Sequence, residues 1–437
     1  MIPKKMIVAP GLEVDAIQTE HFKTEALSIC VTVPLDRHTV PLYGLALSVL
    51  KRGTELYSTI GAINRRLDEL YASGVSLRVD RFGNNCVIGF SAEMLGEAYT
   101  DGKTDVFGGV VDVIMQMLFH PMTDDQGLLL AQFVESEKNI ACDAIEASDN
   151  NPRARAARRC REIMFANDDF GTSLSGTVEQ IRAVTPESLT TAYRNLLTKR
   201  TFRVFYVGEK SIEDVAKRVL RLLKPYLSMG GAYKAITEGV SCDPLPVKRV
   251  NEMTAVAQGK LVMGFRTGVN VRHEDFCAML ILSEIYGGSP ISKLFMNVRE
   301  RLGLCYYCGS TYDIYKGTMF VSCGVDPENR DMAESEILRQ LDEIRHGNIR
   351  EEEFDAAVKA LVSSYRAISD LPATLESYYL GRDLFGVSCS VSACMEGIRR
   401  VSREDVIRLA NRVVLDTVYF LCGEKSEDGE DDVDEML

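Results

Sequence analysis

The sequence predicts an α+β protein, built as a duplicated two-half α/β sandwich in which helices cover mainly antiparallel sheets. Three observations lead to this prediction. Residues 181–209 read again as residues 398–424, since both segments give a capped helix, an apolar strand and a Gly-Glu pair. The copies lie about 215 residues apart, which is half of the 437-residue chain. The composition, with 46% hydrophobic and 26% charged residues, is that of an ordinary globular protein.

The elements before each repeated segment follow one order: a strand, a helix, a second strand, a helix and a longer helix. The apolar residues of the helices recur at helical spacing, and the strands are short apolar runs. The repeated helices begin at Thr185, which precedes a proline, and at Ser402, which forms a capping box with Asp405. The earlier elements are expected at 27–33, 41–54, 85–94, 105–118 and about 126–147 in the first half, and at 260–265, 318–326, 332–345 and 351–368 in the second.

The repeat divides the chain into an N-terminal half at 1–225 and a C-terminal half at 251–424. A linker at 226–250 contains prolines and glycines that break regular elements. The remaining residues, 425–437, form an acidic tail. Residues 423–437 hold eight acids and one Lys, so they carry more than half of the net charge of −13. A solvated polyelectrolyte is expected there, with recruitment of a basic partner as the alternative.

Charge and cysteine content limit the partners and the compartment. An acidic surface disfavours nucleic acid and anionic membranes, and neither a signal peptide nor a long apolar run is present, so a cytoplasmic protein is expected. The twelve cysteines show no disulfide framework. Cys305 and Cys308 form the one C-x-x-C pair. Because residues three apart on a strand point to opposite faces, we predict no metal or redox role for that pair.

The residues alone show no self-sufficient catalytic site. The helix at 41–54 has one apolar stripe, and its other face carries Gly44, Leu47 and Ser48, which bind no ion. The five histidines are too dispersed for a local metal motif, although His346 fits a helix C-terminus. No nucleophile elbow, phosphate loop or dinucleotide fingerprint occurs. The histidines are His21, His38, His120, His273 and His346.

Two segments remain as candidates. Residues 287–307 give a Gly-Gly turn, a helix and a strand, with Arg299 and Tyr306 near one junction. Both side chains are able to donate hydrogen bonds to a peptide carbonyl or its oxyanion. The alternative is an ordinary surface helix end and a strand tyrosine. The second segment is an arginine cluster, which is either a solvated helix face or a wall facing an acidic peptide. It comprises Arg153, Arg155, Arg158, Arg159 and Arg161.

These segments resemble the insulinase/pitrilysin family of peptidases, whose fold is shared with the mitochondrial processing peptidase. In that family an inverted zinc motif, H-x-x-E-H, lies on the first helix of a duplicated α/β unit. The resemblance covers nearly the whole chain and is carried by residues 45–54, 137–152 and 289–307. A narrower resemblance, to a non-zinc-binding subgroup of YfmF-type proteins, is carried by residues 22–24, 67–74, 175–189 and 370–379.

The chain departs from the family at the zinc motif. The resemblance places the motif's His, Glu and His at Gly44, Leu47 and Ser48, and the third zinc ligand near Asp143 or Ala144, of which only the aspartate coordinates. Catalytic zinc needs three protein ligands and a general base, so we expect no metal in this chain and no intact zinc peptidase.

The resemblance implies a catalytically incomplete subunit that forms a heterodimer with a zinc-bearing paralogue and acts on a peptide or small protein. Arg299 and Tyr306 would orient the substrate in trans, and Gly287 and Gly288 would let the peptide backbone approach. Zinc is then expected only in the partner. The alternative is a non-catalytic scaffold or binding protein, tied to protein maturation or to modification of elongation factor P. An enzyme with a cysteine nucleophile lacks any recognisable Cys-His pairing.

Overall fold

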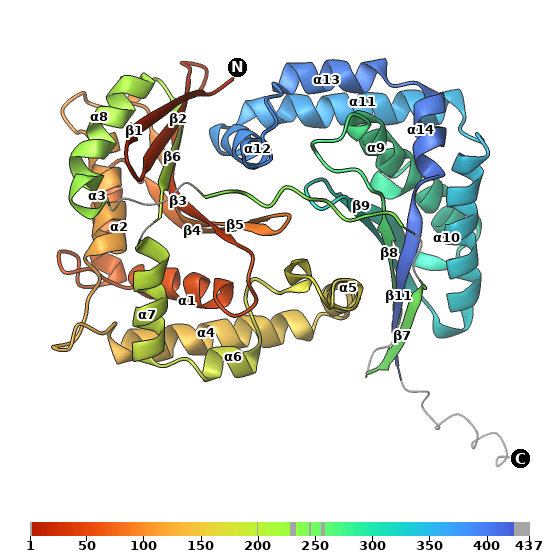
Figure 1. Cartoon of the computed structure of the whole chain (residues 1–437), viewed down its shortest axis with the longest axis horizontal. Helices are drawn as coiled ribbons and strands as arrows, with labels where there is room; N and C mark the ends of the chain where they lie inside the picture. Colours follow the sequence, from red (N-terminus) through yellow and green to blue (C-terminus); the bar gives the residue numbers. More distant parts are fainter. Residues whose placement is uncertain (1, 199, 228–232, 244–245, 255–257, 424–437) are drawn as a thin grey trace, which may run out of the picture.

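The computed structural model describes residues 2–198, 200–227, 233–243, 246–254 and 258–423. In these residues the strands form two sheets, which lie side by side with most helices on their outer sides (Figure 1). Residues 233–243 pass from the first half to the second. The predicted acidic tail lies outside the described residues. None of the helices in the described ranges is long and apolar enough to cross a membrane.

The first half contains six strands and the helices that pack on them, among the described residues. The strands are β1 Lys4–Ala9, β2 Leu12–Gln18, β3 Thr24–Pro34, β4 Gly74–Phe82, β5 Asn85–Leu95 and β6 Phe202–Gly208. The α-helices are α1 Val40–Leu50, α2 Ile60–Glu69, α3 Val106–Phe119, α4 Ala131–Asp149, α5 Pro152–Met164, α6 Val178–Arg182, α7 Pro186–Leu197 and α8 Ile212–Leu223. Short 3₁₀ turns lie at η1 Glu97–Tyr99, η2 Asp169–Gly171 and η3 Lys224–Tyr226.

The second half has five strands within the described residues. They are β7 Lys248–Met253, β8 Gly259–Arg266, β9 Cys305–Asp313, β10 Thr318–Val325 and β11 Val414–Cys422. The helices are α9 Phe276–Ser283, α10 Arg330–Arg345, α11 Glu351–Ala367, α12 Pro372–Leu384, α13 Val391–Arg400 and α14 Arg403–Ala410, with π-helical segments η4 Glu284–Gly288 and η5 Leu294–Arg301. Short 3₁₀ turns lie at η6 Pro327–Asn329 and η7 Ile368–Asp370.

The two sheets share one topology. The first has the order β1-β2-β6-β3-β5-β4 and the second β7-β11-β8-β10-β9, so the second repeats the first without β1. The parallel pair β2 and β6 recurs as β7 and β11, while the other neighbours are antiparallel. The predicted α+β class, with duplicated and mainly antiparallel sheets, is confirmed.

Local sequence signals explain where the helices begin. The side chains of Thr185 and Ser402 accept hydrogen bonds from the third residue of α7 and α14, and each forms the reciprocal bond of a capping box. His346 ends α10, as its position before a glycine predicts. The helix predicted at 41–54 is shorter, because α1 ends at Leu50 and is followed by a turn.

Each half sends one helix onto the sheet of the other half. Helix α5 packs on β8 and β11, and α12 packs on β3 and β6 (Figure 1). The largest hydrophobic core therefore contains residues of both halves, such as Phe205 of β6 and Leu375 of α12. The buried side chains of Arg78 in β4 and Glu376 in α12 form an ion pair between the halves. The halves are held in one arrangement by apolar burial and by charge pairing.

Candidate functional site

The degenerate motif lies in a pocket between α1 and α4. The pocket has a volume of about 400 Å³ and is lined by Gly44 and Ser48 of α1 and by Ala144 of α4. Gly44 and Ser48 share a face because they are four residues apart on a helix. Most of the remaining lining is apolar and comes from Pro41, Leu45, Leu77, Val79, Ile140, Ala141, Leu174 and Ile181. Of the positions that the resemblance assigns to zinc ligands, Gly44, Ser48 and Ala144 line this one pocket. Asp143 does not.

No side chain in this pocket is a free zinc ligand. The Ser48 hydroxyl donates to the Gly44 carbonyl at 3.3 Å, within the helix. Glu137, the one carboxylate among the lining residues, forms an ion pair with Arg52, whose guanidinium also donates to Ser136 Oγ at 3.0 Å. Of the two candidates for the third ligand position, Ala144 lines the pocket and Asp143 does not. These residues do not fit a zinc ion.

Leu47 lies elsewhere than the sequence predicts. The helical pattern placed it on the same face as Gly44 and Ser48, but its side chain is fully buried in the core of the first half. It packs near Ile29 of β3 and Ile88 of β5 rather than in the pocket. Residue 47 is one position before residue 48, so its side chain is turned about 100° around the helix axis from that of residue 48. This rotation places it at the edge of the α1 face that meets the sheet. A leucine at that edge is drawn into the apolar core.

Arg299 and Tyr306 lie close in the sequence and are exposed in different degrees. Arg299 is in η5, where its guanidinium lies 4.6 Å from the Phe295 ring centroid and 3.6 Å from the Glu300 carboxylate. Tyr306 follows on β9 and is 75% exposed. The helix predicted before this strand is a π-helix, a form that often occurs at functional sites.

The two glycines before η5 have local structural roles. Gly287 is buried at the end of η4, and a Cβ there would lie 2.6 Å from the Ser310 backbone nitrogen of β9. A side chain at Gly288 would lie 2.7 Å from the Glu284 carboxylate. The predicted Gly-Gly turn is thus the end of a π-helix packed against a strand. Only a residue without Cβ permits that approach at Gly287.

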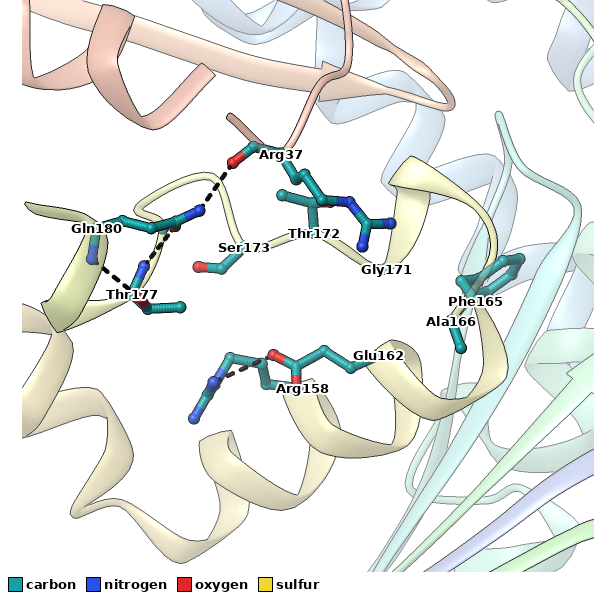
Figure 2. A pocket seen from close by; sticks show the side chains of 11 residues that line it. Arg37, Arg158, Glu162, Phe165, Ala166, Gly171, Thr172, Ser173, Thr177 and Gln180 are labelled. Carbon is teal, nitrogen blue, oxygen red and sulfur yellow. Dashed lines mark hydrogen bonds and ion pairs between the residues drawn. The ribbon is translucent and has the colours of Figure 1, made fainter. Parts of the chain in front are cut away.

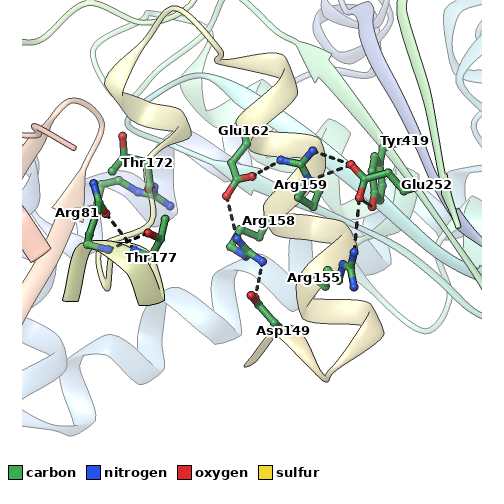
Figure 3. Close-up of polar contacts among 11 residues, drawn as sticks. Arg81, Asp149, Arg155, Arg158, Arg159, Glu162, Thr172, Thr177, Glu252 and Tyr419 are labelled. Atoms are coloured by element: carbon green, nitrogen blue, oxygen red, sulfur yellow. Dashed lines mark hydrogen bonds and ion pairs between the residues drawn. The ribbon is translucent and has the colours of Figure 1, made fainter. Parts of the chain in front are cut away.

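Three arginines of the cluster on α5, Arg155, Arg158 and Arg159, form ion pairs with acids (Figure 3). Glu162 accepts hydrogen bonds from Arg158 at 3.1 Å and from Arg159 at 2.7 Å. Arg159 also pairs with Glu252 of β7 at 2.6 Å, and Tyr419 of β11 donates to the same carboxylate at 2.8 Å. These contacts tie α5 to the second sheet. They favour the interpretation of the cluster as a charge-balanced helix face.

A smaller, polar cavity lies between α5 and residues 171–180 (Figure 2). Its volume is about 190 Å³. Arg158 and Glu162 lie on its α5 side, and Gln180 donates to the Arg37 carbonyl at 3.3 Å on the opposite side. Arg37 in turn pairs with Asp169 at 3.2 Å. The charged groups of this cavity therefore all have partners, because Arg158 and Glu162 pair with each other and Arg37 pairs with Asp169, which does not line the cavity.

The structure contradicts the geometric premise used for Cys305 and Cys308, that the two side chains point to opposite faces. In the structure the two sulfur atoms and that of Cys323 all lie within 4.8 Å of one another. The strand register shifts at Tyr306, so the simple alternation of faces fails between the two cysteines. This group is the one cluster of three potential metal ligands found in the described residues. No signal in the sequence predicts the bulge. The C-x-x-C spacing is the one sequence feature that points to these cysteines.

Comparison with known proteins supplies the last observations. The profile of a family described as "Peptidase M16 inactive domain" matches residues 183–361. The chain is 26% identical to "Probable inactive metalloprotease YmfF" of Bacillus subtilis, over 94% of this chain and 96% of that protein. This match corrects the subgroup label, which is YmfF and not YfmF. The chain is also 23% identical to the "Antilisterial bacteriocin subtilosin biosynthesis protein AlbE" of the same organism, over 91% of this chain and 96% of AlbE.

A solved structure confirms the fold at full length. A conserved protein from Enterococcus faecalis V583 superposes with a TM-score of 0.91 and is 25% identical in sequence, covering 98% of this chain and 100% of that one. The likeness extends over both halves, including the half that carries the degenerate pocket.

Proposed function

Because the chain belongs to the peptidase M16 (insulinase/pitrilysin) family and resembles its inactive members, we propose that it is the non-zinc subunit of a heterodimeric peptidase. In this proposal a zinc-bearing paralogue holds the metal, which activates the attacking water. This chain supplies Arg299 and Tyr306, which hydrogen-bond the substrate carbonyl and stabilise the negative charge that develops on it. The substrate is a peptide or a small protein.

The contrast between the two halves carries the proposal. The pocket around Gly44, Ser48 and Ala144 has no free zinc ligand, so water activation needs another chain. Tyr306, in contrast, is 75% exposed and has no hydrogen-bond partner among the described residues. The Arg299 side chain is 37% exposed. Both donors are thus available to a ligand that approaches from outside the chain.

The surroundings of these donors suit an extended peptide. Strand β9 is an edge of the second sheet, so its outer side is open to an added strand. Met296 and Leu302, on either side of Arg299 in the sequence, are 41% and 44% exposed. Exposed apolar side chains beside an open strand edge support binding of a peptide through its main chain and alternate side chains.

A second candidate function is a scaffold or binding protein without catalysis. The pocket of about 400 Å³ favours it, because an apolar wall replaces the zinc ligands and suits an apolar side chain of a partner. The relative AlbE is named for the biosynthesis of a bacteriocin, which supports a context of peptide maturation for either function.

The test is reconstitution with the paralogue that carries H-x-x-E-H. We expect neither chain alone to hydrolyse a fluorogenic peptide mixture and the mixed pair to do so. Arg299→Ala and Tyr306→Phe should each lower turnover by roughly 10²-fold, the cost of losing an oxyanion donor. Two matched controls, Arg301→Ala in η5 and Tyr99→Phe in the first half, remove equivalent exposed groups and should leave turnover unchanged.

Assembly is measured separately by size-exclusion chromatography with light scattering, so that loss of binding is distinguished from loss of chemistry. If the chains assemble but never hydrolyse peptide, the scaffold function is correct and the subunit proposal fails. If the Arg299 and Tyr306 variants are as active as the controls, these residues do not orient the substrate. Failure of the two chains to assemble overturns the heterodimer.

A further inference from the structure

Three thiols converge in the second sheet, next to Tyr306 of the site proposed above. Cys308 of β9 and Cys323 of β10 are directly opposite each other in the antiparallel ladder. Cys305, at the start of β9, completes the group, and the three sulfur atoms lie within 4.8 Å of one another. Each is a free cysteine. The group therefore presents three sulfur ligands to one point.

A β-bulge at Tyr306 creates this convergence. Tyr307 pairs with Gly324, but Val325 pairs with Cys305, so Tyr306 is an extra residue on β9. In a regular strand Cys305 and Cys308 would point to opposite faces. The extra residue reverses the alternation and returns Cys305 to the face of Cys308 and Cys323, while Tyr306 stays exposed. Glycine at 324 leaves room for the Tyr307 ring, which a Cβ would meet at 2.5 Å.

The site is enclosed on one side and open on the other. Cys308 is 5% exposed and Cys323 is fully buried, whereas Cys305 is only partly buried. Hydrogen bonds from the other two thiols, together with the charge of Arg299, lower the pKa of Cys305 to about 4 against the opposing effect of burial. The hydrogen bond to Cys305, together with burial, raises the pKa of Cys308 and of Cys323. The three sulfur atoms are therefore reached from the side of Cys305.

We propose that Cys305, Cys308 and Cys323 bind a soft, thiophilic d¹⁰ cation as three thiolate ligands, and that the cation is cuprous ion. With metal–sulfur bonds of about 2.3 Å, sulfurs around a trigonal cation stand about 4 Å apart, which the observed separation allows. No fourth cysteine, histidine or carboxylate joins the group in the described residues. A structural zinc site normally has four protein ligands, whereas cuprous ion accepts fewer.

A second thiol group in the same half provides the control. Cys277 at the start of α9 interacts with Cys394 of α13, which also interacts with Cys389. The sulfur atoms of Cys305, Cys308 and Cys323 all lie within 4.8 Å of one another. The sulfur atoms of this second group do not, among the described residues. Cys277 is partly buried, as Cys305 is. Cys277→Ser therefore makes the same chemical change as Cys305→Ser, but outside the proposed site.

The experiment titrates the full chain, without oxygen, against cuprous ion buffered by bicinchoninate, and a parallel arm uses Zn²⁺ alone. The wild-type chain should remove one cuprous ion from the indicator, and X-ray absorption should show sulfur ligands only. Cys305→Ser should weaken binding by at least about tenfold, because a ligand is lost, while Cys277→Ser should bind like the wild type. Circular dichroism confirms that each variant is folded.

The outcomes separate the alternatives. Absence of cuprous binding in the wild type, or equal binding by Cys305→Ser, overturns the site. Stoichiometric Zn²⁺ binding that Cys305→Ser abolishes, without cuprous binding, overturns the choice of cation. The inference is independent of the heterodimer, because no paralogue takes part in this titration.

Discussion

At the scale of single residues, the small residues at three positions of one pocket offer no ligand to a zinc ion. Glycine, serine and alanine occupy the walls of the pocket at 44, 48 and 144, and none of them offers a free ligand atom to zinc. Leu47 has the further effect of filling the core beside β3 and β5. The side chain at this position therefore contributes to packing of the core.

Asp168 is a residue at which stability should depend on pH. Burial opposes its charge, but hydrogen bonds from Lys316, from the Phe170 N–H and from Asn84 outweigh burial and hold the pKa of Asp168 below its usual value. A lowered pKa means that the carboxylate stabilises the fold above the ordinary carboxyl range, and that this stabilisation is lost as the pH falls. Asp168→Asn should therefore be less stable than the wild type at neutral pH.

The measurement is urea unfolding of both proteins between neutral and acid pH. The difference in the free energy of unfolding should shrink as the pH falls through the carboxyl range, because Asp168 becomes protonated in the wild type. Asp169→Asn, at the neighbouring and more exposed position, should change this free energy by less than about 0.5 kcal/mol. A difference between Asp168→Asn and the wild type that stays constant with pH would contradict the assignment.

At the scale of elements, α1 and α4 bring three positions that the resemblance assigns to zinc ligands into one pocket. Gly44 and Ser48 lie one turn apart on α1, and Ala144 of α4 lines the same pocket. A Cβ at Gly44 would lie 3.8 Å from Val79, an ordinary van der Waals contact. The backbone at residue 44 therefore accepts a larger side chain.

Introducing three ligands at these positions should create a zinc site. The variant Gly44→His, Ser48→His, Ala144→Glu places two imidazoles and a carboxylate around one pocket, the ligand number of catalytic zinc. We expect it to bind one Zn²⁺ per chain in isothermal titration calorimetry, and to remain without peptidase activity because Leu47 supplies no base. The background carries Cys305→Ser, so that the thiol cluster does not contribute.

The control for this graft moves the carboxylate by one residue. Asp143→Glu combined with Gly44→His and Ser48→His adds the same groups, but residue 143 is exposed and does not line the pocket. This variant should bind Zn²⁺ at least about tenfold more weakly. Equal affinity in the two variants would show that Ala144 is not the third ligand position.

At the scale of the whole molecule, the exchange of α5 and α12 makes the two halves interdependent. The ion pair of Arg78 and Glu376 lies within this contact, and both side chains are buried. Asp80 also pairs with Arg78, at 2.8 Å, but from a more exposed position. Removing the Glu376 charge leaves a buried guanidinium with incomplete compensation.

Glu376→Gln should accordingly lower the free energy of unfolding by about 3 kcal/mol, which urea unfolding at neutral pH would detect. An exposed pair offers the comparison, since Glu396 and Arg400 on α13 are both largely accessible to solvent. Glu396→Gln should lower the free energy of unfolding by less than about 0.5 kcal/mol. If the two variants are equally stable, the contact between the halves does not depend on this ion pair.

Much of the fold was accessible from the sequence because its signals are local. The caps at Thr185 and Ser402 and the repeated helix-strand segments were confirmed at the predicted positions. Two side chains, Leu47 and Cys305, point in other directions than the sequence predicts. Leu47 was misplaced because helical spacing does not say which face meets the sheet, and Cys305 was misplaced because a bulge changes the alternation of a strand.

The sequence by itself determined the duplicated fold, the family resemblance and the loss of the H-x-x-E-H motif, since these depend on residue type and order along the chain. Only the tertiary structure decided that Ala144, not Asp143, completes the pocket, and that three cysteines meet at one point. Both results depend on how a side chain is directed by elements distant in sequence. A difference of one residue in register reverses that direction, and the amino-acid order does not reveal it.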